Sequence, residues 1–452
     1  MRTRKLECLI VGGGPGGATL ALHLAQRGVD VALVDHGRAH YSGPFETVLA
    51  STKSVWERMG LLEKVQAGVE EDPLRHGAIW GSAELQWRHG EEAGLLLRRG
   101  VFDVALRATA RSAGVEVYES ARLERCQQGW QLLDDTGESI LLQPTLLVYA
   151  TGRAVLPGLP KTHRVGPETT AVTVLGQPAE DDRGSAVVEA VRNGWIWTHV
   201  PHEGEASAAV LVDRIVLKDG KAEDVIESMF ADASGPVRQL RNWRVAHAND
   251  ATMWNRGVAT DCLLLGDAAA TIDPLASQGV EKAVSASEHA SVCIAAALEH
   301  PEWWGRLRAL HARWEHGLQA AHMRSANAFY ELESRFVGES FWQRRQENSQ
   351  SSPQVDADQA LGCSSHVQLA RVLMRHGPRI IEVDGALHDE TGEELARIAR
   401  VPVAAVLGLF VKPVTIADAV ALASKDPNLF VLTPHEVHEA IVQLCMRKWL
   451  VP

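Results

Sequence analysis

The stretch Ile10–Gly17, IVGGGPGG, decides the fold class of this chain. A short apolar run meets a glycine cluster here, and the helical pattern ATLALHLAQRG follows directly. Gly12, Gly14 and Gly17 have the spacing that forms a tight turn, lets backbone approach a pyrophosphate and packs the helix on the strand. The pyrophosphate would lie at the positive end of that helix. The stretch therefore predicts a Rossmann-type dinucleotide site.

A second apolar strand, VALVD, supports this prediction. It ends in Asp35, about twenty residues after the glycines, where a carboxylate can bind a ribose hydroxyl. The same carboxylate argues against a 2′-phosphate, because two anions would repel each other. Asp35 does not separate NAD from FAD. The alternative is a glycine-rich turn without a ligand, which leaves the run of small residues at a helix start unexplained.

The downstream segment Leu263–Gly279, LLLGDAAATIDPLASQG, narrows the choice of cofactor. Its leucines predict a buried strand, Gly266 and Asp267 follow, and a long helical pattern begins at Gly279. This arrangement resembles the GD segment of the superfamily of FAD-dependent monooxygenases and halogenases. The resemblance implies that Asp267 binds the ribitol hydroxyls of FAD and that the following helix directs its N-terminus at the flavin.

Other segments resemble the same superfamily, up to about residue 345. LRRGVFDVALRATARSAGVEV contains Arg99, LLVYATGRA contains Thr151 and Gly152, and residues 43–47, GPFET, resemble a flavin loop. The resemblance implies FAD as the cofactor. The residues that it assigns to FAD binding are Gly12, Gly14, Pro15, Gly17, Asp35, Glu46, Arg99, Thr151, Gly152, Gly266, Asp267, Pro274 and Gly279.

Composition excludes several other classes. The formal net charge of −12 argues against nucleic acid as a partner, because phosphate contacts need clustered Lys and Arg. The six cysteines form no CxxC pair, as is typical of reduced core residues in a reducing compartment. We expect no signal peptide, no membrane span and no metal site. A cytoplasmic enzyme is the natural expectation.

Residues 194–204, GWIWTHVPHEG, predict one wall of a substrate site. Trp195 and Trp197 alternate, so both face one side of a sheet. The segment resembles the W-x-W-x-I-P element of flavin-dependent halogenases, with one extra residue before Pro201. The resemblance implies a substrate tunnel that contains Trp195, Trp197, Pro201 and Ser277. The alternative is an aromatic pair that only packs in a β-layer.

The run Thr271–Gly279 resembles the halogenase segment that passes over the flavin face. Asp273 falls where tryptophan halogenases have a glutamate close to the reacting substrate. The alternative is a simple loop-to-helix transition capped by Ser277, and both can hold at once.

A missing lysine favours hydroxylation over halogenation. Halogenases keep a lysine downstream of the flavin loop for hypohalous acid, whereas the corresponding region here has Arg75 and His76. Lys53 and Lys64 come too early in the chain. Arginine stays protonated and is a poor substitute for an ammonium in a chloramine-like adduct.

The resemblance implies that reduced FAD adds dioxygen to form a C4a-hydroperoxide, whose distal oxygen attacks an electron-rich ring. We expect Asp273 to position or deprotonate the substrate, assisted by His199 or His76. Each histidine could equally be a hydrogen-bonded structural residue. NAD(P)H acting directly and a separate flavin reductase both remain open as electron sources, with O2 as the oxidant.

The expected fold is α/β, or α+β overall. It has a Rossmann-like FAD-binding domain of the glutathione-reductase/para-hydroxybenzoate-hydroxylase type, an inserted β-sheet substrate domain and a C-terminal helical, winged-helix-like domain. The expected parts are a monooxygenase core at 1–345 (FAD-binding at about 1–75, 98–160 and 245–300, substrate sheet at 76–97 and 165–244, helical part at 301–345), a linker at 346–360 and a tail at 361–452.

The tail contains three sequences with a hydroxyl followed three residues later by an acid, which predict helix caps at Thr391, Thr415 and Thr433. Amphipathic segments follow them. Because the tail has more acids than bases, we expect it to bind a peptide or protein and not DNA. The alternative is a structural lid or a dimer contact.

A halogenase-like core without the lysine, joined to such a tail, resembles the flavoprotein monooxygenases that mature tryptophylquinone cofactors. The resemblance implies hydroxylation of a tryptophan in a partner polypeptide, as in the maturation of quinohemoprotein amine dehydrogenase. A flavin-dependent halogenase, a small-molecule aromatic hydroxylase and a geranylgeranyl reductase-like flavoprotein remain alternatives. The sequence does not indicate the oligomeric state.

Overall fold

A computed structural model describes most of the chain as two compact units. The first comprises Met1–Ser291 and His311–Gln350, and the second Val292–Leu310 and Ser351–Pro452. The described residues are 2–36, 45–48, 50–69, 75–88, 95–133, 139–154, 156, 158–218, 221–346 and 358–452. No helix within these ranges is long and apolar enough to span a bilayer.

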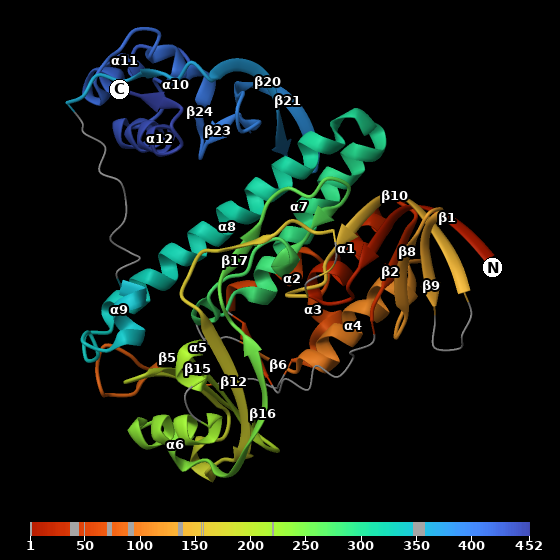
Figure 1. The fold of residues 1–452 in the computed structure, drawn as a ribbon, viewed down its shortest axis with the longest axis vertical. Coiled ribbons are helices and arrows are strands. Elements are labelled where there is room, and N and C mark those ends of the chain that lie inside the picture. Colours follow the sequence, from red (N-terminus) through yellow and green to blue (C-terminus); the bar gives the residue numbers. More distant parts are fainter. Residues whose placement is uncertain are drawn as a thin grey trace. The chain divides into compact units, whose positions relative to one another are not determined.

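A seven-stranded sheet in the first unit contains the predicted βαβ element (Figure 1). Its strands are β1 (Arg2–Val11), β2 (Val31–Val34), β7 (Glu116–Tyr118), β8 (Arg122–Cys126), β9 (Gly129–Leu133), β10 (Ser139–Tyr149) and β18 (Leu263–Leu264). The order is β7-β2-β1-β10-β9-β8, and β18 pairs with the end of β10. All pairs are parallel except β10–β9 and β9–β8. The ends of these strands, CLIV in β1 and LLVY in β10, are apolar and mostly buried, as is typical of parallel strands covered on both faces.

Helix α1 (Pro15–Gln26) follows the glycine turn and packs against α4 (Arg99–Ser112). Pro15 occupies the first helical position, where its missing N–H leaves no extra donor unsatisfied. Leu20 and Leu24 of α1 are fully buried. This helix is therefore a core element whose N-terminus is fixed at the end of β1.

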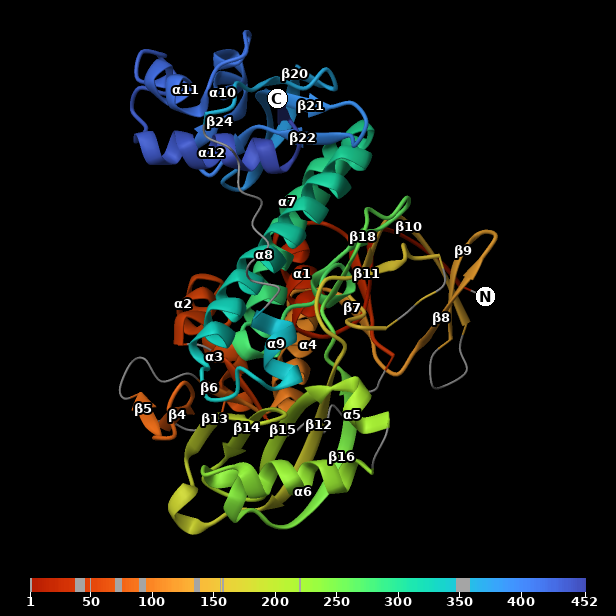
Figure 2. The same ribbon diagram turned by 60° about the vertical axis from the view of Figure 1, so that its left-hand side comes forward.

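A second seven-stranded sheet forms the rest of the core of this unit. Its strands, in spatial order, are β16 (Arg241–Asp250), β12 (Thr169–Gln177), β15 (Ala206–Asp213), β14 (Gly194–Val200), β13 (Ser185–Val191), β4 (Arg75–Ile79) and β5 (Gln86–Arg88). Helix α6 (Ala222–Asp232) covers one face (Figure 2). Ile196 and Val200 of β14 point to α6, whereas Trp195 and Trp197 face the opposite side and join an aromatic cluster. The period-2 alternation predicted for this segment is confirmed.

Two long helices, α7 (Gly279–Glu299) and α8 (Trp304–Leu332), run side by side (Figure 1). His289 of α7 contacts both His311 and Trp314 of α8. The shorter α9 (Ser340–Gln346) then places two aromatic side chains against the second sheet.

Smaller elements complete the first unit. They are β3 (Glu46–Val48), α2 (Ala50–Arg58), α3 (Leu62–Val65), β6 (Leu95–Leu97), β11 (Thr162–Arg164), α5 (Arg214–Lys218) and β17 (Trp254–Arg256). β3 pairs with β6, and β11 pairs with β17.

The tail folds as strands and helices in similar measure. Its main elements are β20 (Val367–His376), β21 (Arg379–His388), β22 (Glu393–Leu395), α10 (Val403–Leu409), α11 (Ile416–Ala423) and α12 (Pro434–Met446). β20, β21 and β22 form an antiparallel sheet. Leu407, Ile416 and Ile441 belong to a common core of the helices. Within the described residues, the tail therefore has three helices, as expected of a winged-helix-like domain, together with more strand structure than the small strand or two expected of it.

Two of the three predicted caps are confirmed. Thr415 accepts from Asp418 N, and Thr433 forms a full capping box with Glu436. The third is wrong, because Thr391 accepts from Glu393 N, only two residues on, and strand β22 follows. This short-range bond stabilises a turn, so no helix begins there.

The predicted linker at 346–360 lies mostly outside the described residues. The domain boundaries proposed from the sequence remain a prediction.

Candidate active site

The carboxyl ends of four parallel strands bring the predicted nucleotide-binding residues to one edge of the first sheet. β1 leads into Gly12, β2 into Asp35, β10 into Thr151 and β18 into Gly266. Backbone hydrogen bonds of 2.8 to 2.9 Å join these strand ends to their neighbours. Ligands of open α/β sheets bind outside this edge.

The glycine turn is tightly packed on one side and open on the other. Gly12 has a φ of +112°, and a Cβ on Gly17 would lie 1.9 Å from the carbonyl oxygen of Gly12. In contrast, a Cβ on Gly14 would meet no atom of the described residues within 4 Å. This open space lies at the N-terminus of α1, where unpaired backbone N–H groups favour an anion. The turn fits a pyrophosphate.

Arg107 of α4 holds the glycine turn and Asp35 in a fixed relation. Its Nη1 donates to Gly13 O at 3.1 Å and lies 3.4 Å from Asp35 Oδ2. Its Nε donates to Glu119 at 2.6 Å. The Asp35 side chain is 20% exposed, so it remains accessible to a ribose hydroxyl. Sequence reasoning missed this arginine.

The segment after β10 offers a further polar position. Thr151 Oγ1 is buried and has no hydrogen-bond partner among the described residues. A Cβ on neighbouring Gly152 would meet none of their atoms within 4 Å. Arg153 Nε lies 3.6 Å from Asp267 Oδ2 and links this segment to the GD segment. An orphaned hydroxyl beside open space fits a polar ligand such as FAD.

Glu46 and Arg99 join two other segments. Arg99 Nη1 lies 2.7 Å from Glu46 Oε2, and its Nη2 lies 3.0 Å from Asp103 Oδ2. Their assignment to FAD binding remains a prediction. Gly43 and Pro44 of the same predicted loop lie outside the described residues.

The GD segment leads directly to the predicted catalytic acid. Asp273 accepts from Leu275 N at 2.9 Å and so caps the short 3₁₀ turn Pro274–Ala276. Ser277 follows with a left-handed φ of +51°, and its Oγ has no hydrogen-bond partner among the described residues. Ser277 therefore does not cap α7, as the alternative interpretation of this segment would require. A Cβ on Gly279, where α7 begins, would meet no described atom within 4 Å.

Asp273 belongs to a buried chain of hydrogen bonds. Tyr330 of α8 donates to Asp273 Oδ2 at 3.0 Å, and Trp195 Nε1 donates to the Tyr330 hydroxyl at 3.2 Å. Burial raises the pKa of Asp273 above its usual value, although the bond from Leu275 N, Arg345 and Tyr330 oppose this. The carboxyl group is therefore held in place and poised to exchange a proton at higher pH than an ordinary aspartate.

The sheet face that contains Trp195 has a row of half-buried side chains across all five strands, which we call the open row. In register across the strands lie Ala78, Val188, Trp197, Ala209 and Thr173. All five are half-buried. Directly opposite residues of paired strands point to the same face, so these side chains form one continuous row.

The rows on either side of the open row are buried on the central strands, whereas their members on the outer strands, Ala171, Leu175 and His76, are half-buried. On one side, Ala190, Trp195 and Leu211 are at most 2% exposed. On the other side, His199 and Ser207 are at most 5% exposed. Successive rows are about 6.6 Å apart along a strand. The open row is thus a narrow strip with Trp197 at its centre.

His199 stacks on Trp197, with ring centroids 5.5 Å apart. Its burial, reinforced by nearby His76, lowers its pKa to about 3. His199 is therefore neutral at physiological pH and can orient a group but cannot act as a cationic acid. Its Nε2 has no hydrogen-bond partner among the described residues.

The hydrogen bonds of Asp273 within the described residues come from Leu275 and Tyr330, and neither His199 nor His76 donates to it. Trp195, which is bonded to Asp273 through Tyr330, and His199 are four residues apart on β14, about 13 Å along the strand. Pro201 lies beyond His199, and its carbonyl accepts from Arg183. In the part of the chain that the structure describes, no three His, Cys, Asp or Glu residues are placed to bind a metal ion.

A lysine does lie close to the GD segment, but it does not face the sheet. Lys282 of α7 is fully buried and lies 2.8 Å from Glu315 Oε2. Its ammonium also donates to Ala270 O at 2.7 Å. With these contacts made, Lys282 is not available at the open row.

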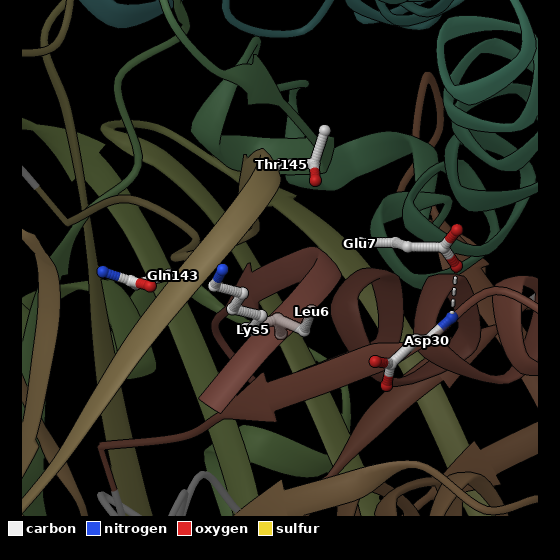
Figure 3. Close-up of a pocket in the computed structure, with 6 residues that line it drawn as sticks. All are labelled: Lys5, Leu6, Glu7, Asp30, Gln143 and Thr145. Atoms are coloured by element: carbon white, nitrogen blue, oxygen red, sulfur yellow. Dashed lines mark hydrogen bonds between the residues drawn. The ribbon is translucent and has the colours of Figure 1, made fainter. Parts of the chain in front are cut away.

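A shallow hollow lies elsewhere on the first sheet (Figure 3). Lys5 and Glu7 line it from β1, Gln143 and Thr145 from β10, and Asp30 donates its backbone N–H to Glu7. Lys5 and Glu7 precede Gly12 by seven and five residues along β1, so the hollow is separate from the candidate site.

Comparisons with known sequences point to two families. Residues 5–136 match the FAD binding domain model, and residues 158–362 match the tryptophan halogenase model. The chain is 25% identical over 328 residues to the tryptophan 2-halogenase of Chondromyces crocatus, which covers 65% of this chain and 61% of that enzyme. It is 23% identical over 360 residues to the 1H-pyrrole-2-carbonyl-[peptidyl-carrier protein] chlorinase of Pseudomonas fluorescens, covering 67% and 78% respectively.

Two solved structures share the fold along nearly the whole chain. The peptidyl tryptophan dihydroxylase QhpG, described as essential for tryptophylquinone cofactor biogenesis, has a TM-score of 0.71 at 24% identity and covers 98% of this chain and 99% of its own. The flavin-dependent halogenase CmlS has a TM-score of 0.68 at 18% identity and covers 99% and 96%. Because both cover the tail, the tail alone does not separate a hydroxylase from a halogenase.

Proposed function

Because the chain belongs to the superfamily of FAD-dependent halogenases and monooxygenases and is an FAD-dependent oxidoreductase, we propose that it hydroxylates an indole-type aromatic ring. The substrate that we propose is a tryptophan side chain of a partner polypeptide. The observation that carries this proposal is the buried Asp273, held by Tyr330 and Leu275 beside a sheet face with one open, aromatic-centred row.

The overall reaction converts an aromatic C–H bond into C–OH. When bound and reduced, FAD supplies the two electrons needed to split dioxygen, so that one oxygen atom enters the ring and the other leaves as water. NAD(P)H or a separate flavin reductase provides those electrons. The residues that would hold FAD are those of the glycine turn, Asp35, Thr151 and the GD segment.

Asp273 is the group that we propose to handle the proton. Its ionised carboxylate accepts the N–H of an indole or the proton lost from the attacked carbon, and hydrogen bonds from Tyr330 and Leu275 fix its direction. Trp197 supplies an aromatic face against which an indole packs. The dry cluster around Trp195 and Trp342 excludes water from this end of the row.

A polypeptide substrate is supported by two observations. The fold matches that of a peptidyl tryptophan dihydroxylase over the whole chain. The tail also exposes large apolar side chains, with Val411 at 82%, Phe430 at 61% and Val431 at 66%. Exposed apolar groups of this kind often mark protein-binding surfaces.

Halogenation is the second candidate, and the named relatives favour it because they are halogenases. Against it stands the sequence of residues 65–160, which contains no lysine. The buried ion pair of Lys282 with Glu315 also keeps that ammonium from the open row.

Product analysis separates the two candidates. The FAD-loaded protein would be given a flavin reductase, NADH, bromide and a tryptophan-containing peptide in air, and the peptide mass would be measured. We expect the peptide to gain the mass of oxygen and to show no bromine isotope pattern. Bromination without oxygen addition would establish the halogenase alternative.

A further inference from the structure

We propose that Glu315 and Lys282, a buried ion pair outside the reacting groups, are positioning residues that hold the GD segment in its FAD-binding conformation. This inference rests on the proposed function only in requiring that FAD binds at that segment. It assigns a role to two side chains that the proposed chemistry leaves unused.

The pair ties down both ends of one turn. Glu315 Oε1 accepts from Gly266 N at 2.6 Å, and Lys282 Nζ donates to Ala270 O at 2.7 Å. The carboxylate and ammonium lie 2.8 Å apart, and both side chains are fully buried. Between the two tied ends lies Asp267, the predicted FAD ligand.

Stability alone does not account for such a pair. Burying two charges costs several kcal/mol per ion, and replacing a buried pair by well-packed apolar residues is often neutral or stabilising. Burial opposes ionisation of Glu315, but the charge of Lys282 and contact with His311 outweigh it, so the pKa of this carboxyl lies below its usual range. The Glu315 carboxylate therefore stays ionised, and the shortest polar contacts of the pair, at 2.6 and 2.7 Å, go to the backbone of the turn.

Further residues of helix α8 bind the segment that runs from the GD turn to Asp273. Gln319, one turn after Glu315, donates to Thr271 O at 2.6 Å and to Trp254 O at 3.0 Å. Tyr330, on the same helix, donates to Asp273. One rigid helix therefore contacts the segment from Gly266 to Asp273 in order, and it fixes the distance between the predicted FAD ligand and the proposed catalytic acid.

The test compares two buried glutamates that each accept backbone N–H groups. The double variant E315Q/K282M removes both charges with little change in volume. The control E189Q alters a glutamate that accepts from Ser234 N and Gly235 N, within the second sheet. Apo-protein of each is titrated with FAD by flavin fluorescence quenching, and its thermal unfolding is measured.

The double variant should bind FAD at least tenfold more weakly than wild type, whereas E189Q should keep the wild-type affinity at a comparable loss of thermal stability. Wild-type FAD affinity in E315Q/K282M, or an equal loss in E189Q, would overturn the inference. If the double variant does not fold, E315D replaces it, since its shorter carboxylate cannot reach both partners, and the same tenfold loss is expected. Halogenases and hydroxylases both bind FAD. Bromination of the peptide would therefore contradict the proposed function without affecting the FAD affinities measured in this test.

Discussion

Asp273 has both carboxylate oxygens engaged, one by Leu275 N and one by the Tyr330 hydroxyl. These bonds fix the orientation of the carboxylate, whereas its burial raises its pKa above the usual value. We expect D273N to bind FAD normally and to lose at least about a hundredfold in turnover, within the range that general base catalysis contributes. Turnover within a few-fold of wild type would remove Asp273 from the mechanism.

The pH profile of turnover tests the same residue through its neighbour. Because ionised Asp273 is required, activity should fall on the acidic side with an apparent pKa above that of an ordinary aspartate. The Tyr330 hydroxyl favours the ionised form, so Y330F should move this acidic limb to higher pH. An unmoved limb in Y330F would show that another group titrates.

Because His199 is buried and neutral, we expect the free energy of unfolding to depend on pH. Its folded-state pKa is about 3 against an ordinary value of 6.5, so the unfolded chain binds a proton more readily than the native one. The contribution is complete above about pH 6.5 and is lost as the pH falls towards 3, by up to about 1.4 kcal/mol per pH unit. Urea unfolding of wild type and H199Q should therefore converge as the pH is lowered, and parallel curves would contradict the burial of a neutral imidazole.

At this scale the sequence identifies groups with a local motif. Asp273 and Asp267 stand in recognisable runs, so their positions could be predicted. Tyr330 and Arg107 could not, because each acts on a segment far away in the sequence. Tyr330 lies in the helical stretch that follows the GD segment, but nothing in its local sequence distinguishes a core tyrosine from one bonded to Asp273.

The glycine turn before α1 gives a prediction about FAD binding and stability. Gly14 has an extended backbone, open surroundings and the N-cap position of α1, where serine is preferred. G14S should keep or raise the thermal stability of the apo-protein while weakening FAD binding at least about tenfold, equivalent to about 1.4 kcal/mol. G17A should instead destabilise the fold, because its Cβ would overlap Gly12 O. Unchanged FAD affinity in G14S would place the pyrophosphate elsewhere.

The open row of the second sheet gives a second prediction at the scale of an element. A209L would fill the space between Trp197 and Thr173 and should reduce turnover of an indole substrate at least about tenfold, with FAD affinity unchanged. A248L on β16, where the side chain is exposed, is the matched control and should behave as wild type. Equal activity of A209L and A248L would show that the substrate does not use this row.

Elements that depend on residues close in the sequence could be predicted, whereas elements that depend on distant partners could not. The βαβ unit and the caps at Thr415 and Thr433 depend on residues within one turn, so the sequence specified them. β20 and β21 could not be predicted in the same way, since strand pairing depends on partners that a single segment does not reveal. Thr391 has the same cap pattern as Thr415, yet Glu394 is drawn to Arg306 and Leu373 N, and β22 forms there.

For the whole molecule, the sequence predicted an FAD-dependent core followed by a separate tail. It did not predict where the boundary between the two compact units falls. Val292–Leu310, which contains the end of α7, the connection and the start of α8, groups with the tail. Arg306 explains this locally, because it pairs with both Glu382 and Glu394. Such long-range ion pairs leave no mark in either segment alone.

We propose that oxygen passes from dioxygen to an indole ring while FAD is held at the glycine turn and the GD segment. The most direct test of this transfer supplies the FAD-loaded protein with a flavin reductase, NADH and ¹⁸O-labelled dioxygen, and measures the mass of a tryptophan-containing peptide. We predict that the label appears on the tryptophan side chain, and in D273N only in traces. A peptide that remains unlabelled while the wild-type protein binds FAD and consumes oxygen would contradict the account.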